Sequence, residues 1–389
     1  MYLIYLTYTY RVNRLIKFFM GINMRVLHTA LLKQASPGIA NQMYWEQLAA
    51  EELGIEWRSF LCVSEVSEKV NKENMKIIKL FNQEENWFSL RKKYYDWLMS
   101  EQDNFDVLVL RHSSSTPQEY FFLKSINKPV YLVHHTLELP EIISNAGSGI
   151  IRTGTKYAIE SFFGSLSIKY AKNIICVTNE IFEYENNRVS NKFKQKTIYP
   201  NGILFDKKLT DTKFKKEGEI PQILFVAGHF SSWHGLDILL ENIKSTHKDF
   251  TLHIAGVVDE KDKLTAKQDS RVILHGAMNK DELKILMDKA WIGLSSFALS
   301  RKKMTEACTL KVREYLFNGI PVYSGHKDIF PIEFSYYKFG SPKIEDILSF
   351  AEEMKSEVRE EVSKSAEPYI SKVKLLEKLY SDLKILNFH

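Results

Sequence analysis

The sequence predicts an α/β protein that is built from two doubly wound halves. Short apolar runs alternate with longer amphipathic segments along most of the chain. After the turn Pro200-Asn201-Gly202 the alternation resumes, so that it forms two successive series. With 389 residues, the chain is also long enough for two domains of ordinary size. Alternation of this kind is typical of parallel strands that are joined by helical crossovers.

The first series begins at Met24 with the run MRVLHTALL. Three further strand candidates follow, FDVLVLRH, PVYLVHHT and NIICVT, and amphipathic segments lie between them. The second series contains the candidates QILFVAGH, FTLHIAG, RVILHGA and IGLSS. We therefore predict one domain over residues 24–200 and a second domain over residues 201–343. Residues 344–389 are charged and are predicted to be helical, without strands.

The composition indicates a globular protein without a nucleic-acid partner. Apolar residues make up 44% of the chain and charged residues 26%. The net charge is only +5, and the basic residues are spread along the sequence. Cys62, Cys176 and Cys308 have no metal-binding spacing, which indicates reduced thiols in a cytoplasmic protein. Cys176 lies in an apolar run and is predicted to belong to the core.

Residues 1–23 form a predicted N-terminal extension. Their apolar run ends before Arg11, which makes it too short to span a bilayer, and the charges follow it instead of preceding it as in a secretory signal. One interpretation is an extension upstream of a natural start at Met24. The other is an interfacial segment that places Arg11, Arg14 and Lys17 near lipid headgroups, with peripheral contact at the inner face of the cytoplasmic membrane.

The most informative segment spans residues 295–323. It leaves a strand, passes through a polar loop, and is predicted to become a helix from about Thr309 that ends at Gly319. The start of a helix directs free N–H groups and a positive dipole end toward the preceding loop, which suits a phosphate group. Glu306 and Glu314, with seven residues between them, can then accept hydrogen bonds from sugar hydroxyls at either end of a diphosphate.

This segment resembles the E-x7-E motif of the retaining glycosyltransferases with the GT-B fold, the family called GT4 or glycosyl transferases group 1. The resemblance implies two Rossmann-like domains that face a central cleft, an acceptor-side domain followed by a nucleotide-sugar-binding domain. It also implies that the helices of residues 344–389 cross back to the first domain. In the family the first Glu, here Glu306, contacts the donor sugar, and the second, here Glu314, contacts the ribose of the nucleotide.

The second domain opens with FVAGHFSSWHGLDILLENI, which resembles the family's phosphate loop G-R-x-S-x-x-K-G. Gly228 matches that pattern, but His229 replaces the Arg and His234 replaces the Lys. Histidine can donate a hydrogen bond to phosphate but is only partly charged near its usual pKa of about 6.5. The alternative is that both are loop histidines and that backbone amides hold the phosphate. Because the loop lacks two cations, we expect Lys311, in the first turn of the following helix, to neutralise the diphosphate.

In the first domain, PVYLVHHT resembles the family's P-x-x-x-x-x-H-[DT] strand end and implies that His135 lies beside the donor sugar. On a strand His134 points to the opposite face, so only one of the pair can reach the ligand directly. Glu138 follows and is either a hydrogen-bond acceptor for the substrate or a loop carboxylate. The predicted catalytic residues are therefore Glu306, His135 and Lys311. The predicted donor-binding residues are Gly38, Gly228, His229, Ser232, His234, Gly276, Cys308, Thr309, Leu310 and Glu314.

Together these residues predict a retaining glycosyltransferase that moves a sugar from a nucleotide-diphospho-sugar to a glycan or lipid-linked acceptor in bacterial surface polysaccharide synthesis. We expect no metal, because no D-x-D motif stands at a strand end, and no cofactor besides the sugar-nucleotide co-substrate. One alternative is a sugar-nucleotide epimerase of the same fold, which needs no acceptor. Another is a non-catalytic partner of a second transferase, favoured by the two histidines in place of cations.

Overall fold

The computed structural model describes residues 23–68, 70–81, 86–144, 149–189, 194–205 and 219–388. The predicted extension lies outside this part except for its last residue. Contacts divide the chain into two compact units. Unit 1 contains the chain up to Cys176, Ile181–Tyr199 and Lys372–His389, and unit 2 contains Val177–Glu180 and Pro200–Ser371.

Unit 1 is built on a six-stranded parallel sheet in the order β3-β2-β1-β4-β5-β6. This is the strand order of a Rossmann fold. The strands are β1 (Val26–Gln34), β2 (Trp57–Glu65), β3 (Ile78–Leu80), β4 (Val107–Arg111), β5 (Val130–His134) and β6 (Asn173–Cys176). The helices are α2 (Pro37–Leu53), α3 (Trp87–Ser100), α4 (Pro117–Ser125), α5 (Glu138–Ser144), α6 (Ile150–Ile159), α7 (Ser165–Tyr170), α8 (Asn179–Asn187) and α15 (Lys372–Phe388), with short turns η1 (Lys72–Ile77), η2 (Gln102–Asn104) and the π-helical η4 (Glu160–Gly164).

The core of unit 1 joins the start of the chain to its last helix. Leu376 and Leu383 of α15 pack with Val26 and Trp57 in one buried cluster. The hydroxyl of Tyr380 accepts a hydrogen bond from the Met24 amide at 3.0 Å and donates one to the Met24 carbonyl at 2.9 Å. These bonds satisfy the Met24 amide and carbonyl just before β1. Cys176 is fully buried, so its predicted place in the core is confirmed.

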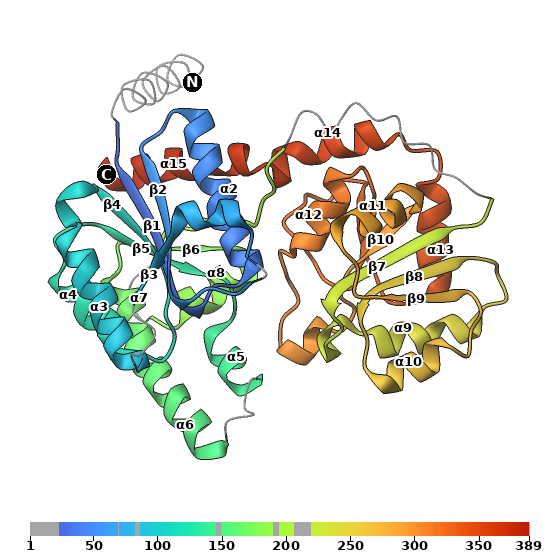
Figure 1. Cartoon of the computed structure of the whole chain (residues 1–389), viewed down its shortest axis with the longest axis horizontal. Helices are drawn as coiled ribbons and strands as arrows, with labels where there is room; N and C mark the ends of the chain where they lie inside the picture. The colour runs from blue at the N-terminus through green and yellow to red at the C-terminus, as the bar shows by residue number, and fades with distance from the viewer. Residues whose placement is uncertain are drawn as a thin grey trace, which may run out of the picture. The chain divides into compact units, whose positions relative to one another are not determined.

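Unit 2 repeats the same topology, with six parallel strands in the order β12-β11-β10-β7-β8-β9. Helices cover both faces of each sheet (Figure 1). The strands are β7 (Gln222–His229), β8 (Thr251–Val257), β9 (Val272–Gly276), β10 (Ile292–Leu294), β11 (Val322–Ser324) and β12 (Tyr337–Phe339). The helices are α9 (Leu236–Asn242), α10 (Glu260–Ala266), α11 (Lys280–Lys289), α12 (Leu310–Phe317), α13 (Ile344–Glu353) and α14 (Arg359–Ile370), with short turns η6 (Ser232–His234), η7 (Ile243–Ser245) and η8 (Leu299–Lys302). The α/β prediction of two doubly wound halves is confirmed.

The predicted helix near Thr309 is α12. Thr309 is its N-cap residue, and the chain leaves the helix through Gly319, whose φ is +69°. A Cβ atom at that glycine would lie 2.3 Å from the carbonyl oxygen of Arg359. The Arg359 side chain is buried and donates hydrogen bonds to the carbonyls of Met287 and Ala290 at the end of α11. The helix therefore ends at Gly319 because both the left-handed backbone and the close neighbour require glycine.

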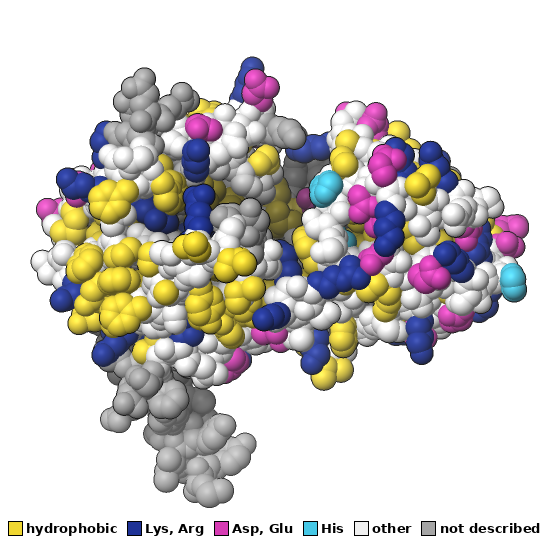
Figure 2. Space-filling model, turned by 90° about the horizontal axis from the view of Figure 1, so that it is seen from below, with side chains coloured by type: hydrophobic (Ala, Val, Ile, Leu, Met, Phe, Trp, Pro, Cys, Tyr) yellow, Lys and Arg dark blue, Asp and Glu magenta, His cyan; other side chains and the backbone are white. Residues whose placement is uncertain are grey.

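No helix in the part of the chain that the structure describes is both long and apolar enough to cross a bilayer. On the face shown in Figure 2, Lys and Arg side chains are spread out, whereas hydrophobic side chains gather in one area. Among the exposed hydrophobic residues of unit 1, Phe121, Phe162 and Tyr170 belong to one group of touching rings with Tyr120 and Phe163.

Candidate functional site

In unit 2 the predicted donor-binding residues follow the carboxyl ends of parallel strands. Gly228 and His229 end β7, Gly276 ends β9, and α12 begins after the loop that leaves β10. In doubly wound sheets ligands bind at this carboxyl edge. Gly228, His229 and Gly276 are exposed there, and Gly276 has a φ of +70°.

The turn after β7 is held by reciprocal hydrogen bonds between Ser231 and His234. The Ser231 amide donates to Nδ1 of His234 at 2.9 Å, and the Ser231 hydroxyl accepts from the His234 amide. Ser232, the first residue of η6, is exposed. Gly235 then enters α9 with a φ of +71°, and a Cβ atom there would lie 3.0 Å from the Ala298 amide nitrogen. The loop is therefore preorganised, as a backbone cradle for an anion needs to be.

The His234 ring is neutral and is held in place by neighbouring side chains. Its side chain is buried, stacks on Trp233 with ring centroids 3.7 Å apart, and meets the edge of Phe230. Burial lowers its pKa to about 4, and the positive charges of Lys302 and His229 act in the same direction. Because Nδ1 accepts a hydrogen bond, Nε2 carries the proton and is the nitrogen that can donate to a ligand.

The basic loop at residues 299–303 is engaged with the same turn. Arg301 donates to the Ser232 carbonyl at 2.6 Å and forms a two-pronged pair with Asp237, at 3.0 and 2.7 Å. The Lys302 ammonium lies 4.8 Å from the centre of the Trp233 ring. Two of the three basic residues in this loop thus support the turn after β7.

The amino end of α12 carries four of the predicted residues. Thr309 caps the helix without a side-chain cap bond, so the first-turn amides of Leu310 and Lys311 have no partner within the helix. The Lys311 ammonium pairs with Glu314 Oε2 at 2.5 Å. The buried Cys308 accepts a hydrogen bond from the Asn201 amide on Sγ and another from the Asn201 side chain on its carbonyl, at 3.0 and 2.6 Å.

Glu306 precedes the helix and is half-buried. Its Oε2 accepts a hydrogen bond from the backbone amide of Glu180 at 2.9 Å. In return, the Glu180 carboxylate accepts from the amides of Thr305 and Glu306 at 2.9 and 2.8 Å. The carboxylate that the sequence assigns to the donor sugar therefore has a backbone partner here.

Sequence analysis missed the buried ion pair beneath this helix. Arg313 is fully buried and donates to Asp328 Oδ1 at 2.6 Å and to the Asn201 carbonyl at 3.1 Å. Although burial alone would lower the Arg313 pKa, the Asp328 charge raises it above its usual value. The signal in the sequence was an arginine three residues before Leu316, on the apolar side of the predicted helix. The Arg313 side chain thus ties α12 both to Asp328 and to the turn at Asn201.

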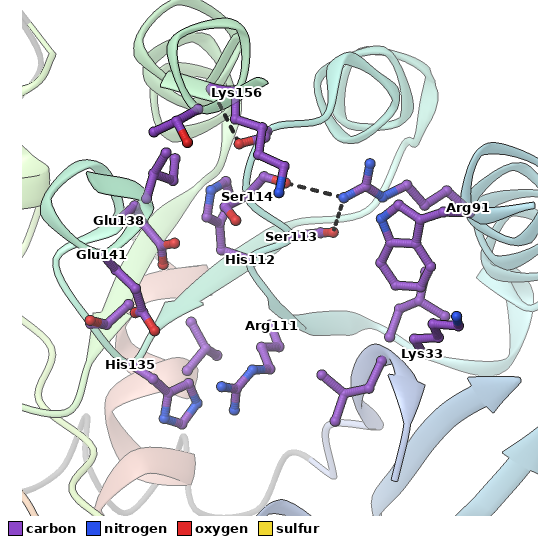
Figure 3. A pocket seen from close by; sticks show the side chains of 18 of the residues that line it. Lys33, Arg91, Arg111, His112, Ser113, Ser114, His135, Glu138, Glu141 and Lys156 are labelled. Atoms are coloured by element: carbon purple, nitrogen blue, oxygen red, sulfur yellow. Dashed lines mark hydrogen bonds between the residues drawn. The ribbon is translucent and has the colours of Figure 1, made fainter. Parts of the chain in front are cut away.

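In unit 1, Gly38 and His135 lie at the carboxyl edge of the other sheet. Gly38 is in the first turn of α2, whose N-cap residue Ser36 makes no side-chain cap bond. His135 directly follows β5 and lines a cavity of about 720 Å³ (Figure 3). Burial lowers the pKa of His135 well below its usual value, and the charge of Arg111 lowers it further. The cavity is lined by Leu31, Leu32, Lys33, Trp87, Arg91, Arg111, His112, Ser113, Ser114, Ser115, Val133, His135, Thr136, Glu138, Glu141, Ile142, Arg152, Thr153 and Lys156.

A buried charged network lies under one wall of this cavity. His112 Nδ1 contacts Glu119 Oε1 at 2.6 Å, and its Nε2 contacts Glu160 Oε1 at 3.2 Å. Burial would lower the His112 pKa, but the two carboxylates raise it well above its usual value. Arg188 adds a further ion pair to Glu160 at 2.8 Å and one to Glu185. Buried networks of this kind hold the loops around a site in a fixed position.

Glu138 is the unusual carboxyl group of the cavity. Burial raises its pKa to about 7, so both protonation states are populated at neutral pH. Its Oε1 lies 3.5 Å from Nδ1 of the buried His134. Neither ring nitrogen of His134 makes a hydrogen bond within the described residues, and its ring stacks on His112 with centroids 4.7 Å apart.

His112, His134 and Glu138 bring potential metal-ligand atoms within 4.8 Å of one another. Metal binding requires a neutral imidazole. However, carboxylates occupy both ring nitrogens of His112 and favour its doubly protonated form. The arrangement therefore suits a hydrogen-bonded cluster better than a metal centre.

Comparisons with known proteins agree with this topology. The family model described as glycosyl transferases group 1 matches residues 220–327. A search of curated proteins finds no match. Among solved structures, the lipopolysaccharide outer core galactosyltransferase WaaB in its apo form superposes with a TM-score of 0.61, at 15% identity over 94% of this chain and 100% of that chain.

Two further structures have a similar fit. A glycosyltransferase from Rickettsia africae ESF-5 has a TM-score of 0.61 at 14% identity, over 94% of this chain and 98% of that chain. Anabaena Alr3699/HepE in complex with UDP has a TM-score of 0.60 at 12% identity, over 93% of this chain and 100% of that chain. The fold of the chain is therefore that of the GT-B glycosyltransferases, and the match over residues 220–327 supports a glycosyltransferase.

Proposed function

We propose that the protein is a retaining, metal-independent glycosyltransferase of the GT4 type, which moves a sugar from a nucleotide-diphospho-sugar to a glycan or lipid-linked acceptor in surface polysaccharide synthesis. The observation that carries the proposal is the amino end of α12. It follows the carboxyl end of β10, lies inside the segment that matches the glycosyltransferase family, and is flanked by Glu306 and Glu314. Unbonded first-turn amides and the helix dipole suit a diphosphate at that position.

In this proposal unit 2 holds the donor and stabilises the leaving group. The amides of Leu310 and Lys311, together with the Lys311 ammonium, balance the charge that develops on the departing nucleoside diphosphate. Glu314 accepts hydrogen bonds from the ribose, and Glu306 contacts the donor sugar. Lys311 and Glu314 form an ion pair, so their side chains lie on the same side of α12, which supports a shared role in donor binding. His234 contributes a neutral Nε2–H donor instead of the charge of a lysine.

The family resemblance further assigns His135 to the donor sugar and Gly38 to the loop over the donor phosphates. For a retaining enzyme of this type the donor phosphate takes the proton of the acceptor hydroxyl while the new bond forms on the same face of the sugar. Catalysis then consists of positioning and of charge stabilisation, so no nucleophilic side chain is needed.

A panel of nucleotides tests the donor half of the proposal. HepE, a structural neighbour at 12% identity, was solved with UDP-glucose, so UDP and UDP-hexoses are the first ligands to try, followed by the guanine, thymine and cytosine diphosphates. We expect one nucleoside diphosphate to raise the Tm, and EDTA to leave transfer unchanged. No stabilisation by any of the four would contradict the proposal.

Product analysis separates transfer from epimerisation. An epimerase candidate from Listeria monocytogenes shares the fold with a TM-score of 0.51, lower than the transferases reported above. A transferase releases nucleoside diphosphate in proportion to added acceptor. An epimerase instead changes the sugar nucleotide without an acceptor. Acceptor-dependent release supports the proposal, and acceptor-independent formation of a new sugar nucleotide refutes it.

A lipid-linked acceptor would bring the protein to a membrane surface. The exposed Phe121, Phe162 and Tyr170 are suited to the headgroup region, where aromatic rings are favoured. Sedimentation with anionic phospholipid vesicles tests this part of the proposal. Equal binding by the wild type and by a variant with all three rings replaced by serine would refute a role for this surface.

A further inference from the structure

The cavity of unit 1 carries an excess of positive charge. Five of its lining residues are Lys or Arg and two are Glu. In Figure 3, Glu138 and Glu141 lie on one side of the cavity, and Lys33 and Arg91 lie on the other. A cavity with one cationic wall and one acidic wall suits a ligand that has an anionic group at one end and hydroxyl groups at the other.

Arg111 is the most informative residue of the cavity. It ends β4 at the carboxyl edge of the sheet, and its half-buried side chain lines the cavity. Its guanidinium makes no hydrogen bond or ion pair with any residue among those described. Burial lowers the pKa of Arg111, and the negative charges of Glu138 and Glu141 act in the opposite direction. A guanidinium that loses water without gaining a bonded partner costs free energy in the empty protein, and an anionic ligand removes that cost.

Arg91 lines the same cavity on the side of Lys33 and is held in place (Figure 3). Its Nη2 donates to the Ser114 carbonyl at 3.1 Å, and the guanidinium stacks on Trp87 at 4.7 Å from the ring centre. Across the loop, the Ser115 hydroxyl donates to the Lys156 carbonyl at 3.1 Å, which attaches the last turn of α6 to the cavity rim. The Arg91 guanidinium is thus oriented before any ligand arrives, which lowers the entropy cost of binding.

We propose that this cavity is the acceptor site and that it recognises an acceptor carrying a phosphate or diphosphate group, held by Arg111, Arg91 and Lys33, with its sugar hydroxyls toward Glu138 and Glu141. Several cations around one space suit a group with two or more negative charges, whereas a carboxylate needs only one arginine. The inference rests on the proposed function, since it names the class of acceptor that the transferase uses.

Binding to the full chain is the first test. Titration calorimetry compares glucose 1-phosphate with the neutral methyl glucoside, for the wild type and for Arg111→Gln. The matched control is Arg58→Gln, because Arg58 lies on β2 near the opposite, amino edge of the same sheet. We expect the wild type and R58Q to bind the phosphate, and R111Q to bind it on the order of tenfold to a hundredfold more weakly. Equal affinity for the two sugars, or no effect of R111Q, would overturn the proposal.

Thermal unfolding separates this role from a structural one. Because Arg111 is a half-buried charge with no bonded partner among the described residues, R111Q should unfold at the same temperature as the wild type or at a higher one. A larger drop in Tm than in R58Q would show that Arg111 serves the fold and would count against the proposal.

Competition with UDP distinguishes this inference from the proposed function. If glucose 1-phosphate binds with the same affinity in saturating UDP, the cavity is separate from the donor site, as proposed. Displacement by UDP would assign the cations to the donor and overturn the inference, while leaving a transferase intact. If instead no nucleotide binds but R111Q still weakens sugar phosphate binding, the proposed function fails and the anion site stands.

A kinetic comparison identifies the source of the phosphate. The acceptors are glucose 1-phosphate in solution and a polyprenyl diphosphate sugar in phosphatidylcholine vesicles. A higher kcat/KM for glucose 1-phosphate indicates a soluble phosphorylated acceptor, and a higher kcat/KM for the polyprenyl diphosphate sugar indicates a lipid-linked one. Either result supports the anion site if R111Q lowers that kcat/KM. Equal transfer to methyl glucoside by the wild type would refute it.

Discussion

Replacing Lys311 with Met tests whether this lysine neutralises the donor diphosphate in a loop where two histidines replace the usual cations. Lys311 pairs with Glu314 at 2.5 Å, with the two side chains 33% and 30% exposed. Such a pair, three residues apart on a helix, contributes only about 0.3–0.5 kcal/mol. A hydrogen bond from a charged group to phosphate contributes about 1.5–3 kcal/mol. Donor phosphate therefore outcompetes Glu314 for the ammonium group.

The difference between the two values gives the expected effect. K311M should lose about 1–2.5 kcal/mol of binding, or roughly fivefold to seventyfold in the Kd for nucleoside diphosphate. Titration calorimetry measures this against His229→Ala, which we expect to have the smaller effect because the His229 side chain is exposed to water. Lys244→Met is the matched control, since Lys244 forms the same kind of pair with Glu241 at 2.8 Å on the surface of unit 2.

Either of two results would refute this prediction. If K311M binds as tightly as K244M, Lys311 does not contact the phosphates. If H229A weakens binding more than K311M, the histidine has kept the role of the arginine that it replaces, and the compensation by Lys311 is wrong. The two lysine variants should unfold at similar temperatures, because each loses one ion pair between side chains three residues apart that are in contact with solvent.

Three further predictions concern single side chains. Glu306→Gln should lower the rate of transfer on the order of a hundredfold. Its Tm should change little, because the remaining side-chain oxygen can still accept a hydrogen bond from the Glu180 amide. Transfer at the wild-type rate would remove Glu306 from the site. Donor affinity should be nearly constant from pH 6 to 8, since burial lowers the His234 pKa to about 4. If donor affinity instead falls with rising pH and His234→Ala abolishes that fall, the bound donor protonates the His234 ring. Glu46→Gln should destabilise unit 1 by about 3 kcal/mol at pH 7. Burial opposes ionisation of Glu46, but the contact with His28 and the hydrogen bonds to the carboxylate lower its pKa from 4.5 to about 2. The stabilisation by the ionised carboxylate is therefore present above about pH 4.5 and is lost as the pH falls toward 2. Hydrogen exchange in β1 and α15 measures that loss with β7 as the internal reference, and equal changes in both units would contradict it.

The local elements were readable from the sequence because each depends on nearby residues. Buried parallel strands need apolar side chains on both faces, so runs such as NIICVT identified the strands before their order was known. The start of α12 at Leu310 and its end before Gly319 followed from helix-capping chemistry within one segment. The pair between Lys311 and Glu314 is local as well, since three residues on a helix always bring side chains to the same face.

Contacts between distant segments were decided only by the tertiary structure. Lys33, Arg111 and His135 line one cavity because β1, β4 and β5 run parallel and their carboxyl ends meet at one edge of the sheet. Similarly, the Glu180 amide reaches Glu306 across 126 positions of the chain. No periodicity in the sequence encodes such pairs, because strand order and register are fixed by the packing of the whole sheet against its helices. The chemistry of each residue could therefore be read from the sequence, but the absence of a bonded partner for Arg111 among the described residues was visible only once every neighbour had its place.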